Sequence, residues 1–217
     1  MYLLIFISFI LLNYKISSKV SNKTFEEIMI LGFLFYSSSI ILTGYLLSEF
    51  HLWNSRILWC IIPFFFSYFL YILFKKKVFY SEIIVKSAFK ITGSTIQSIH
   101  LEFSKMNLFE RIIFSILFWT ISILTVFQVY IIFNSPPNEW DSMTGHLNRI
   151  LYFAQNHTTA HFVGTNWNID TYPKSFSSIQ YYPFIMSGYN EHFFKLPNLS
   201  AYWMLFIASY AIQKQLE

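Results

Sequence analysis

The chain has little charge and only one cysteine. Of its 217 residues, 12% are Asp, Glu, Lys or Arg, about half the share in an ordinary soluble domain. The single cysteine, Cys60, excludes an internal disulfide and a metal site built from several cysteines. No basic stripe interleaved with aromatic residues is present, so we expect no nucleic-acid partner.

Apolar and aromatic residues are correspondingly abundant. Hydrophobic residues make up 55% of the chain and aromatic residues 22%, including 26 Phe. This composition predicts a membrane protein, and a membrane helix needs about 20 mostly apolar residues. The fold class predicted is all-α, a polytopic membrane protein with about five transmembrane helices and an amphipathic-helix outer loop. The five expected helices cover residues 1–13 (extending towards 17), 28–48, 57–74, 111–133 and 198–212.

The lysines predict an orientation. They concentrate in the loops 15–23 and 75–105, which five alternating helices place on one side of the bilayer. Because cytoplasmic loops carry the excess of Lys and Arg, we expect a multi-pass protein of the cell membrane with loop 134–197 extracytoplasmic. The predicted organisation is residues 1–110 as amino-terminal helices with a basic cytoplasmic loop, and residues 111–217 as a core that carries loop 134–197.

The most polar stretch, residues 136–161, follows the fourth expected helix directly. It reads PPNEWDSMTGHLNRILYFAQNHTTAH. Projected as a helix at about 100° per residue, residues 141–156 are amphipathic, with the apolar face expected against the bilayer or neighbouring helices. We expect the polar face to look into an aqueous cavity, with Arg149 and Asn156 close to it and His146 at the boundary. The apolar face comprises Met143, Leu147, Ile150, Leu151 and Ala154, and the polar face Asp141, Thr144, Gly145, Asn148, Tyr152 and Gln155.

Asp141 is the candidate catalytic residue of this segment. A carboxylate at the membrane interface can accept a proton as general base from a hydroxyl group of a substrate; it can equally cap the amino-terminal end of a helix. Arg149 suits a substrate phosphate or a lipid phosphate. His146 and His161 suit the leaving phosphate, or ordinary hydrogen bonds. The histidines lack the spacing of a zinc motif, so no metal site is predicted, and a requirement for a divalent metal ion stays open.

The aromatic residues outside this segment have two interpretations. Trp167, Tyr172, Tyr181 and Tyr182 suit either stacking on sugar rings or the aromatic belt at the membrane surface, where tyrosine and tryptophan are enriched. Trp53 and Trp59, towards one end of the third expected helix, fit the same belt.

Residues Trp140–Phe162, WDSMTGHLNRILYFAQNHTTAHF, resemble the first outer loop of GT-C class bacterial membrane glycosyltransferases. The similarity is greatest to family 39-like proteins, which are related to dolichyl-phosphate-mannose protein mannosyltransferases. The later stretch QYYPFIMSGYNEHFFKLPNLSAYW resembles that family's proline-containing segment that re-enters the membrane. The resemblance covers about residues 136–202. The matching residues of the first stretch are Trp140, Asp141, Ser142, Met143, Thr144, His146, Leu147, Arg149, Phe153, Gln155, Asn156, His161 and Phe162.

This resemblance implies transfer of a sugar from a polyprenyl-phosphate-linked donor, with inversion, to an unidentified cell-envelope acceptor, and it implies that Asp141 is catalytic. The expected partners are membrane lipid and the polyprenyl-phosphate sugar donor. No cofactor is implied with certainty. The residues expected to bind substrate are His146, Arg149, Tyr152, Asn156 and His161. Gly145 and Asn148 depart from the usual tyrosine and proline. With five expected helices against about ten in the family, the chain resembles an amino-terminal portion.

Two other hypotheses remain open from the sequence. One is a non-catalytic multi-pass protein of envelope assembly or transport, although a transporter is expected to carry ionisable or broken sites inside its spans, and the spans here are almost free of charge. The other is an inactive truncated remnant of the enzyme.

Overall fold

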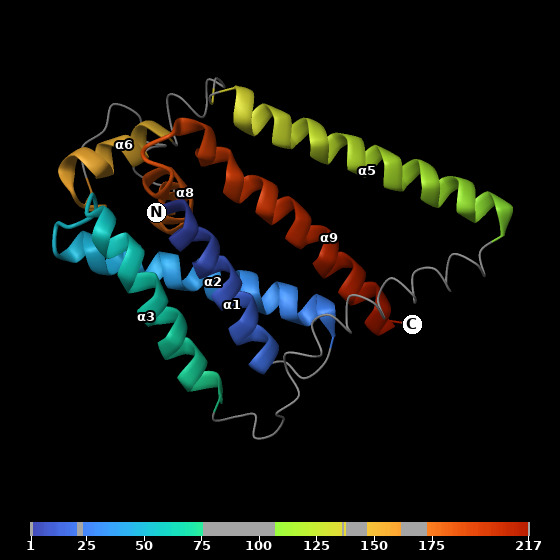
Figure 1. Ribbon diagram of the computed structural model, residues 1–217, viewed down its shortest axis with the longest axis horizontal. Helices are drawn as coiled ribbons and strands as arrows, with labels where there is room; N and C mark the ends of the chain where they lie inside the picture. The colour runs from blue at the N-terminus through green and yellow to red at the C-terminus, as the bar shows by residue number, and fades with distance from the viewer. Residues whose placement is uncertain are drawn as a thin grey trace. The chain divides into compact units, whose positions relative to one another are not determined.

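The computed structural model describes residues 2–20, 24–75, 107–135, 137, 147–161 and 173–216. All regular structure in these ranges is helical (Figure 1), which confirms the all-α prediction for them. They form two units, residues 1–78 with 132–217 and residues 79–131. The helices are α1 (Tyr2–Val20), α2 (Phe25–Glu49), α3 (Arg56–Lys75), α5 (Leu108–Asn134), α6 (Leu147–Asn156), α8 (Lys174–Met186), the short 3₁₀ helix η2 (Glu191–Lys195) and α9 (Leu196–Leu216).

Helices α1 and α2 pack as an antiparallel pair. The hydroxyl of Ser17 in α1 donates to the carbonyl of Ile28 in α2 at 2.9 Å. One turn farther along, Gly32 makes room for the ring of Tyr14, since a Cβ atom there would lie 2.7 Å from Cε1 of that ring. A small residue thus lets the two backbones approach closely, as is common between membrane helices.

Helix α3 packs against both of these helices through a buried polar chain. Ser67 of α3 donates to the amide oxygen of Asn13 in α1 at 2.9 Å, and its oxygen lies 2.8 Å from the hydroxyl of Ser39 in α2. The Asn13 amide in turn donates to the carbonyl of Phe9 at 2.8 Å. The Ser39 hydroxyl also donates to the carbonyl of Phe35 in its own helix, at 2.7 Å. These contacts form a hydrogen-bonded polar cluster across three helices, which fixes their register in an apolar setting.

Within the described residues, three helices are long and apolar enough to cross a membrane: α2, α3 over residues 56–74, and α5. Helix α1 is apolar but shorter, over Tyr2–Ser18, and α9 is long without reaching the same hydropathy. A membrane protein is therefore supported, and the expected second, third and fourth spans agree with these helices to within about three residues. The count of five spans is not confirmed.

Helix α5 has the character of a lipid-facing span. Asn107 caps its first turn: the Asn107 side chain accepts from the Glu110 amide at 2.9 Å, and the Glu110 carboxylate accepts from the Asn107 amide at 2.8 Å. Its hydroxyls bond back to the helix's own carbonyls, as Thr120 does to Ile116 at 2.8 Å. Large apolar side chains are exposed on all sides of it, which is the pattern of a helix surrounded by hydrocarbon.

Helices α6, α8 and η2 lie across one end of the α1–α3 bundle (Figure 1). We call residues 147–161 and 173–195 the end layer. It lies at the start of α1 and α3 and the finish of α2, because Arg56 contacts both Tyr2 and Met186, and Ser48 contacts Thr159. The described part of loop 134–197 therefore contains α6, α8 and η2, where the sequence predicted a single amphipathic helix.

Candidate functional site

Helix α6 is the described part of the predicted amphipathic segment. Leu147 and Ile150 are buried in the core as the projection predicted, and Phe153, which was not placed on the predicted apolar face, is buried with them. Leu151 departs from the projection, since its side chain is 37% exposed. Leu151 follows Ile150 directly, and a step of 100° carries it out of the contact with the layer beneath.

Arg149 does not lie on the exposed face. It is 2% exposed, its Nη2 donates to the hydroxyl of Ser177 in α8 at 2.8 Å, and its guanidinium lies 5.9 Å from the ring centre of Phe153. The helical projection that put Arg149 near an aqueous face was therefore wrong, because it had no information on where α8 packs. A buried guanidinium is retained only where hydrogen-bond partners meet it, and Ser177 is such a partner. Its role in binding substrate stays a prediction.

Three of the expected substrate-binding residues are exposed on the end layer. Tyr152, Asn156 and His161 all reach the surface, and the Asn156 amide donates to the Tyr152 carbonyl at 2.9 Å. A phenol, an amide and an imidazole offer the mixed donors and acceptors that sugar hydroxyls need. The other two predicted site residues, Asp141 and His146, lie outside the described residues.

The segment that carries His161 is fixed to the end of α2. The Ser48 hydroxyl accepts from both the amide and the hydroxyl of Thr159, each at 2.8 Å. The amide of Trp53 donates to the carbonyl of His157 at 3.1 Å. His157 itself has a φ of 59°, a left-handed conformation that ends α6 and turns the chain. The exposed residues of α6 thus stand on an anchored scaffold.

The tryptophans and tyrosines singled out from the sequence form the core beneath this scaffold. Trp53, Trp59, Tyr181 and Tyr182 are each 0% exposed. Trp53 stacks on Tyr181 with ring centres 5.2 Å apart and meets Trp59 edge-on at 5.3 Å. Neither the belt nor sugar stacking therefore describes these four residues. Trp167 and Tyr172 lie outside the described residues.

A hydrogen-bonded asparagine links α8 to the turn between α2 and α3. Asn54 accepts from the hydroxyl of Tyr181 at 2.8 Å and from that of Tyr189 at 3.1 Å. Burial, with a smaller effect of neighbouring Tyr189, raises the pKa of Tyr181 well above its ordinary value, so this phenol is a neutral donor. The hydroxyl of Tyr182 is also buried, and among the described residues it has no hydrogen-bond partner.

The sequence interpretation gave no role to Ser48, Asn54, Arg56 and Ser177, all of which hold the end layer in place. A signal for the first three was available, because the predicted topology puts the 49–55 link on the same side of the membrane as loop 134–197. The sequence held no such signal for Ser177, because a serine among aromatic residues does not indicate which residue it will bond. Within the described ranges no three His, Cys, Asp or Glu side chains gather where they could hold a metal ion.

No family model, curated protein or solved structure matches this chain. The likeness to membrane glycosyltransferases therefore rests on the residues of 136–202 alone. What the end layer can do chemically follows from its exposed polar groups and the apolar helices below them: it can hold a polar molecule at a membrane surface.

Proposed function

We propose that the chain is a membrane glycosyltransferase of GT-C type, or the amino-terminal part of one. It moves a sugar from a polyprenyl-phosphate donor to a cell-envelope acceptor on the extracytoplasmic side. Asp141 acts as the general base that takes the proton from the acceptor hydroxyl, which then attacks the sugar carbon that bears the phosphate. The phosphate leaves on the lipid.

The observation that carries this proposal is the anchored end layer. A donor with a lipid tail and a sugar head needs apolar surface beside polar side chains at one end of a helix bundle. Helices α2 and α3 expose apolar surface, and Tyr152, Asn156 and His161 are exposed at their end. Rigid support for such groups is what catalysis requires, since geometry held in advance lowers the cost of reaching the transition state.

The roles of the remaining residues follow from their chemistry. Tyr152 and Asn156 hydrogen-bond sugar hydroxyls, and His146 and His161 stabilise the leaving phosphate. Arg149 keeps a place in the proposal because of its position in the matching motif, but its bond to Ser177 gives it a structural duty as well. Substitution of Arg149 is therefore expected to lower stability together with activity.

The test is sugar transfer by a complete protein carrying Asp141→Asn. Membrane vesicles receive a radiolabelled polyprenyl-phosphate sugar, and label on the acceptor is counted. We expect transfer to fall by at least about 10²-fold, the lower range for loss of a general base. Asp170→Asn, which removes another carboxylate of the same loop, is the matched control and keeps its activity. Undiminished transfer by the Asp141 variant at equal expression removes Asp141 from the mechanism.

The alternative is a non-catalytic membrane protein of envelope assembly or transport. The burial of Arg149 favours it, because the cation expected to meet a phosphate instead joins α6 to α8. A complete protein that transfers no sugar from any polyprenyl-phosphate donor, while remaining folded, supports this alternative.

A further inference from the structure

Arg56 is a second arginine at the same end of the bundle, and no charge among the described residues matches it. It is the first residue of α3, directly before the apolar run of that span. None of the described residues forms an ion pair with it, and its Nε is buried without a hydrogen-bond partner among them. A half-buried cation without an anion is costly, which indicates that a negative group beyond the described residues completes it.

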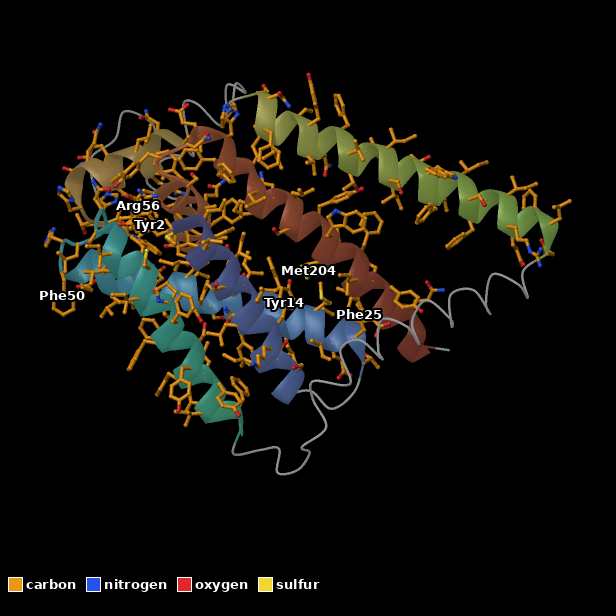
Figure 2. All side chains as sticks on the ribbon, viewed as in Figure 1. Tyr2, Tyr14, Phe25, Phe50, Arg56 and Met204 are labelled. Atoms are coloured by element: carbon orange, nitrogen blue, oxygen red, sulfur yellow. The ribbon has the colours of Figure 1, made fainter. Side chains whose placement is uncertain are left out.

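The guanidinium of Arg56 is already held in place. Its Nη2 donates to the carbonyl of Met186 at 3.1 Å, and its central carbon lies 3.7 Å from the ring centre of Tyr2. Figure 2 shows Arg56 and Tyr2 together at the end of α3 and α1. Gly188 lies beside the guanidinium of Arg56, because a Cβ atom at that glycine would be 3.6 Å from Nη2. Because these contacts fix the side chain, binding an anion costs little further conformational entropy.

The surroundings of Arg56 point to a lipid as the source of the anion. Ile57 and Ile61, the next residues on the outward side of α3, are 63% and 59% exposed. Leu3 and Leu4, beside Tyr2, are 51% and 69% exposed. A charged group at the end of a spanning helix, with bare apolar side chains below it, matches a phosphate with acyl chains.

We propose that Arg56 binds the phosphate of a membrane phospholipid at the end of α3. The guanidinium donates to two phosphate oxygens, the ring of Tyr2 supports its face, and the acyl chains lie along Ile57 and Ile61. The site differs from the proposed sugar-transfer site, and it does not depend on that reaction.

The experiment is native mass spectrometry of the full chain in detergent, with dimyristoyl phosphatidylglycerol, dimyristoyl glycerol or undecaprenyl phosphate added at equal concentrations. We expect phosphatidylglycerol to remain bound and the diglyceride, which has the same tails without phosphate, to be lost. Arg56→Gln lowers the bound fraction by about tenfold, the effect of losing a charge-assisted hydrogen bond. Lys174→Gln, the same charge change at the start of α8, leaves it unchanged.

Three results overturn the proposal. They are equal retention of the diglyceride, unchanged retention of phosphatidylglycerol by Arg56→Gln, and retention of undecaprenyl phosphate alone, which assigns Arg56 to a polyprenyl carrier instead. If Arg56→Gln fails to fold, Arg56→Lys decides: it keeps the charge without the fork, so retention between that of the wild type and zero is expected. Retention equal to that of the wild type contradicts the bidentate contact.

Discussion

Tyr181 and Tyr182 offer a matched pair of substitutions, because they are neighbours on α8 with different hydroxyl environments. Both are fully buried. The Tyr181 hydroxyl donates to Asn54, whereas the Tyr182 hydroxyl has no partner among the described residues. Replacement by phenylalanine keeps both rings in their aromatic contacts, Trp53 for Tyr181 and Phe9 for Tyr182. Each substitution therefore measures the hydroxyl alone.

The free energy of unfolding is expected to fall for Tyr181→Phe but not for Tyr182→Phe. Tyr181→Phe loses a net hydrogen bond, which costs about 1 kcal/mol; Tyr189 still donates to Asn54 and keeps the cost at that level. In the wild type, burial of the Tyr182 hydroxyl without a partner costs about 1–3 kcal/mol, because its hydrogen bonds to water are lost. Tyr182→Phe removes this cost. A small gap left by the missing oxygen offsets part of the gain. Stability of this variant is expected to stay level or to rise by about 1 kcal/mol.

The assay is reversible unfolding in mixed micelles with increasing dodecyl sulfate, followed by tryptophan fluorescence, since Trp53 contacts Tyr181 and Trp59 contacts both tyrosines. Tyr189→Phe is the control, because it removes the longer and more exposed bond to the same oxygen, and its effect is expected to be smaller than that of Tyr181→Phe. The reasoning is refuted if Tyr182→Phe destabilises the fold as much as Tyr181→Phe does.

Two further predictions concern the same core. In Gly44→Ala the new methyl group meets the Cβ atom of Ser178 at 2.9 Å and Trp53 at 3.0 Å, so we expect the free energy of unfolding to fall by about 1–3 kcal/mol. In a double-mutant cycle, Ser178→Gly is expected to restore part of that loss. An unchanged stability of Gly44→Ala contradicts the close packing of α2 on α8. Stability is also expected to fall above pH 10, because burial raises the pKa of Tyr181 and Tyr182 in the fold while the unfolded chain ionises near pH 10. Below pH 10 the stabilising contribution of the two neutral phenols is fully present. Above pH 10 each tyrosine lowers the free energy of unfolding by about 1.4 kcal/mol per pH unit. Unfolding curves between pH 8 and 11 that show no such decline contradict the burial of these phenols in neutral form.

The parts of the fold that the sequence predicted are those encoded by local pattern. Long apolar runs set α2, α3 and α5, and their ends follow from charged or polar residues, as at Glu49 and Arg56. The apolar stripe of α6 was visible for the same reason. Helix α8 was not predicted, because nearly all its sides are buried and it carries prolines at its start and inside it, so neither a periodic pattern nor a clean boundary marks it.

In the candidate site, too, the features set by local pattern were predictable from the sequence, and those set by tertiary packing were not. Exposure of Tyr152 and Asn156 follows from their helical positions, but burial of Arg149 depends on Ser177, which is 28 residues away in the chain. The polar chain through Asn13, Ser39 and Ser67 likewise joins three helices. Such long-range partners are set by tertiary packing, and a single sequence gives no measure of it.

The claim on which the proposed function rests is that the end layer faces the outside of the cell. Labelling of cysteines in intact cells tests it directly. The one native cysteine, Cys60, is buried, and Cys60→Ser provides the background. Asn156→Cys, at an exposed position of α6, is expected to react with a membrane-impermeant maleimide in intact cells, whereas Lys15→Cys, exposed at the opposite end of α1, reacts only after the membrane is opened. Labelling of Lys15→Cys but not of Asn156→Cys in intact cells would contradict the account.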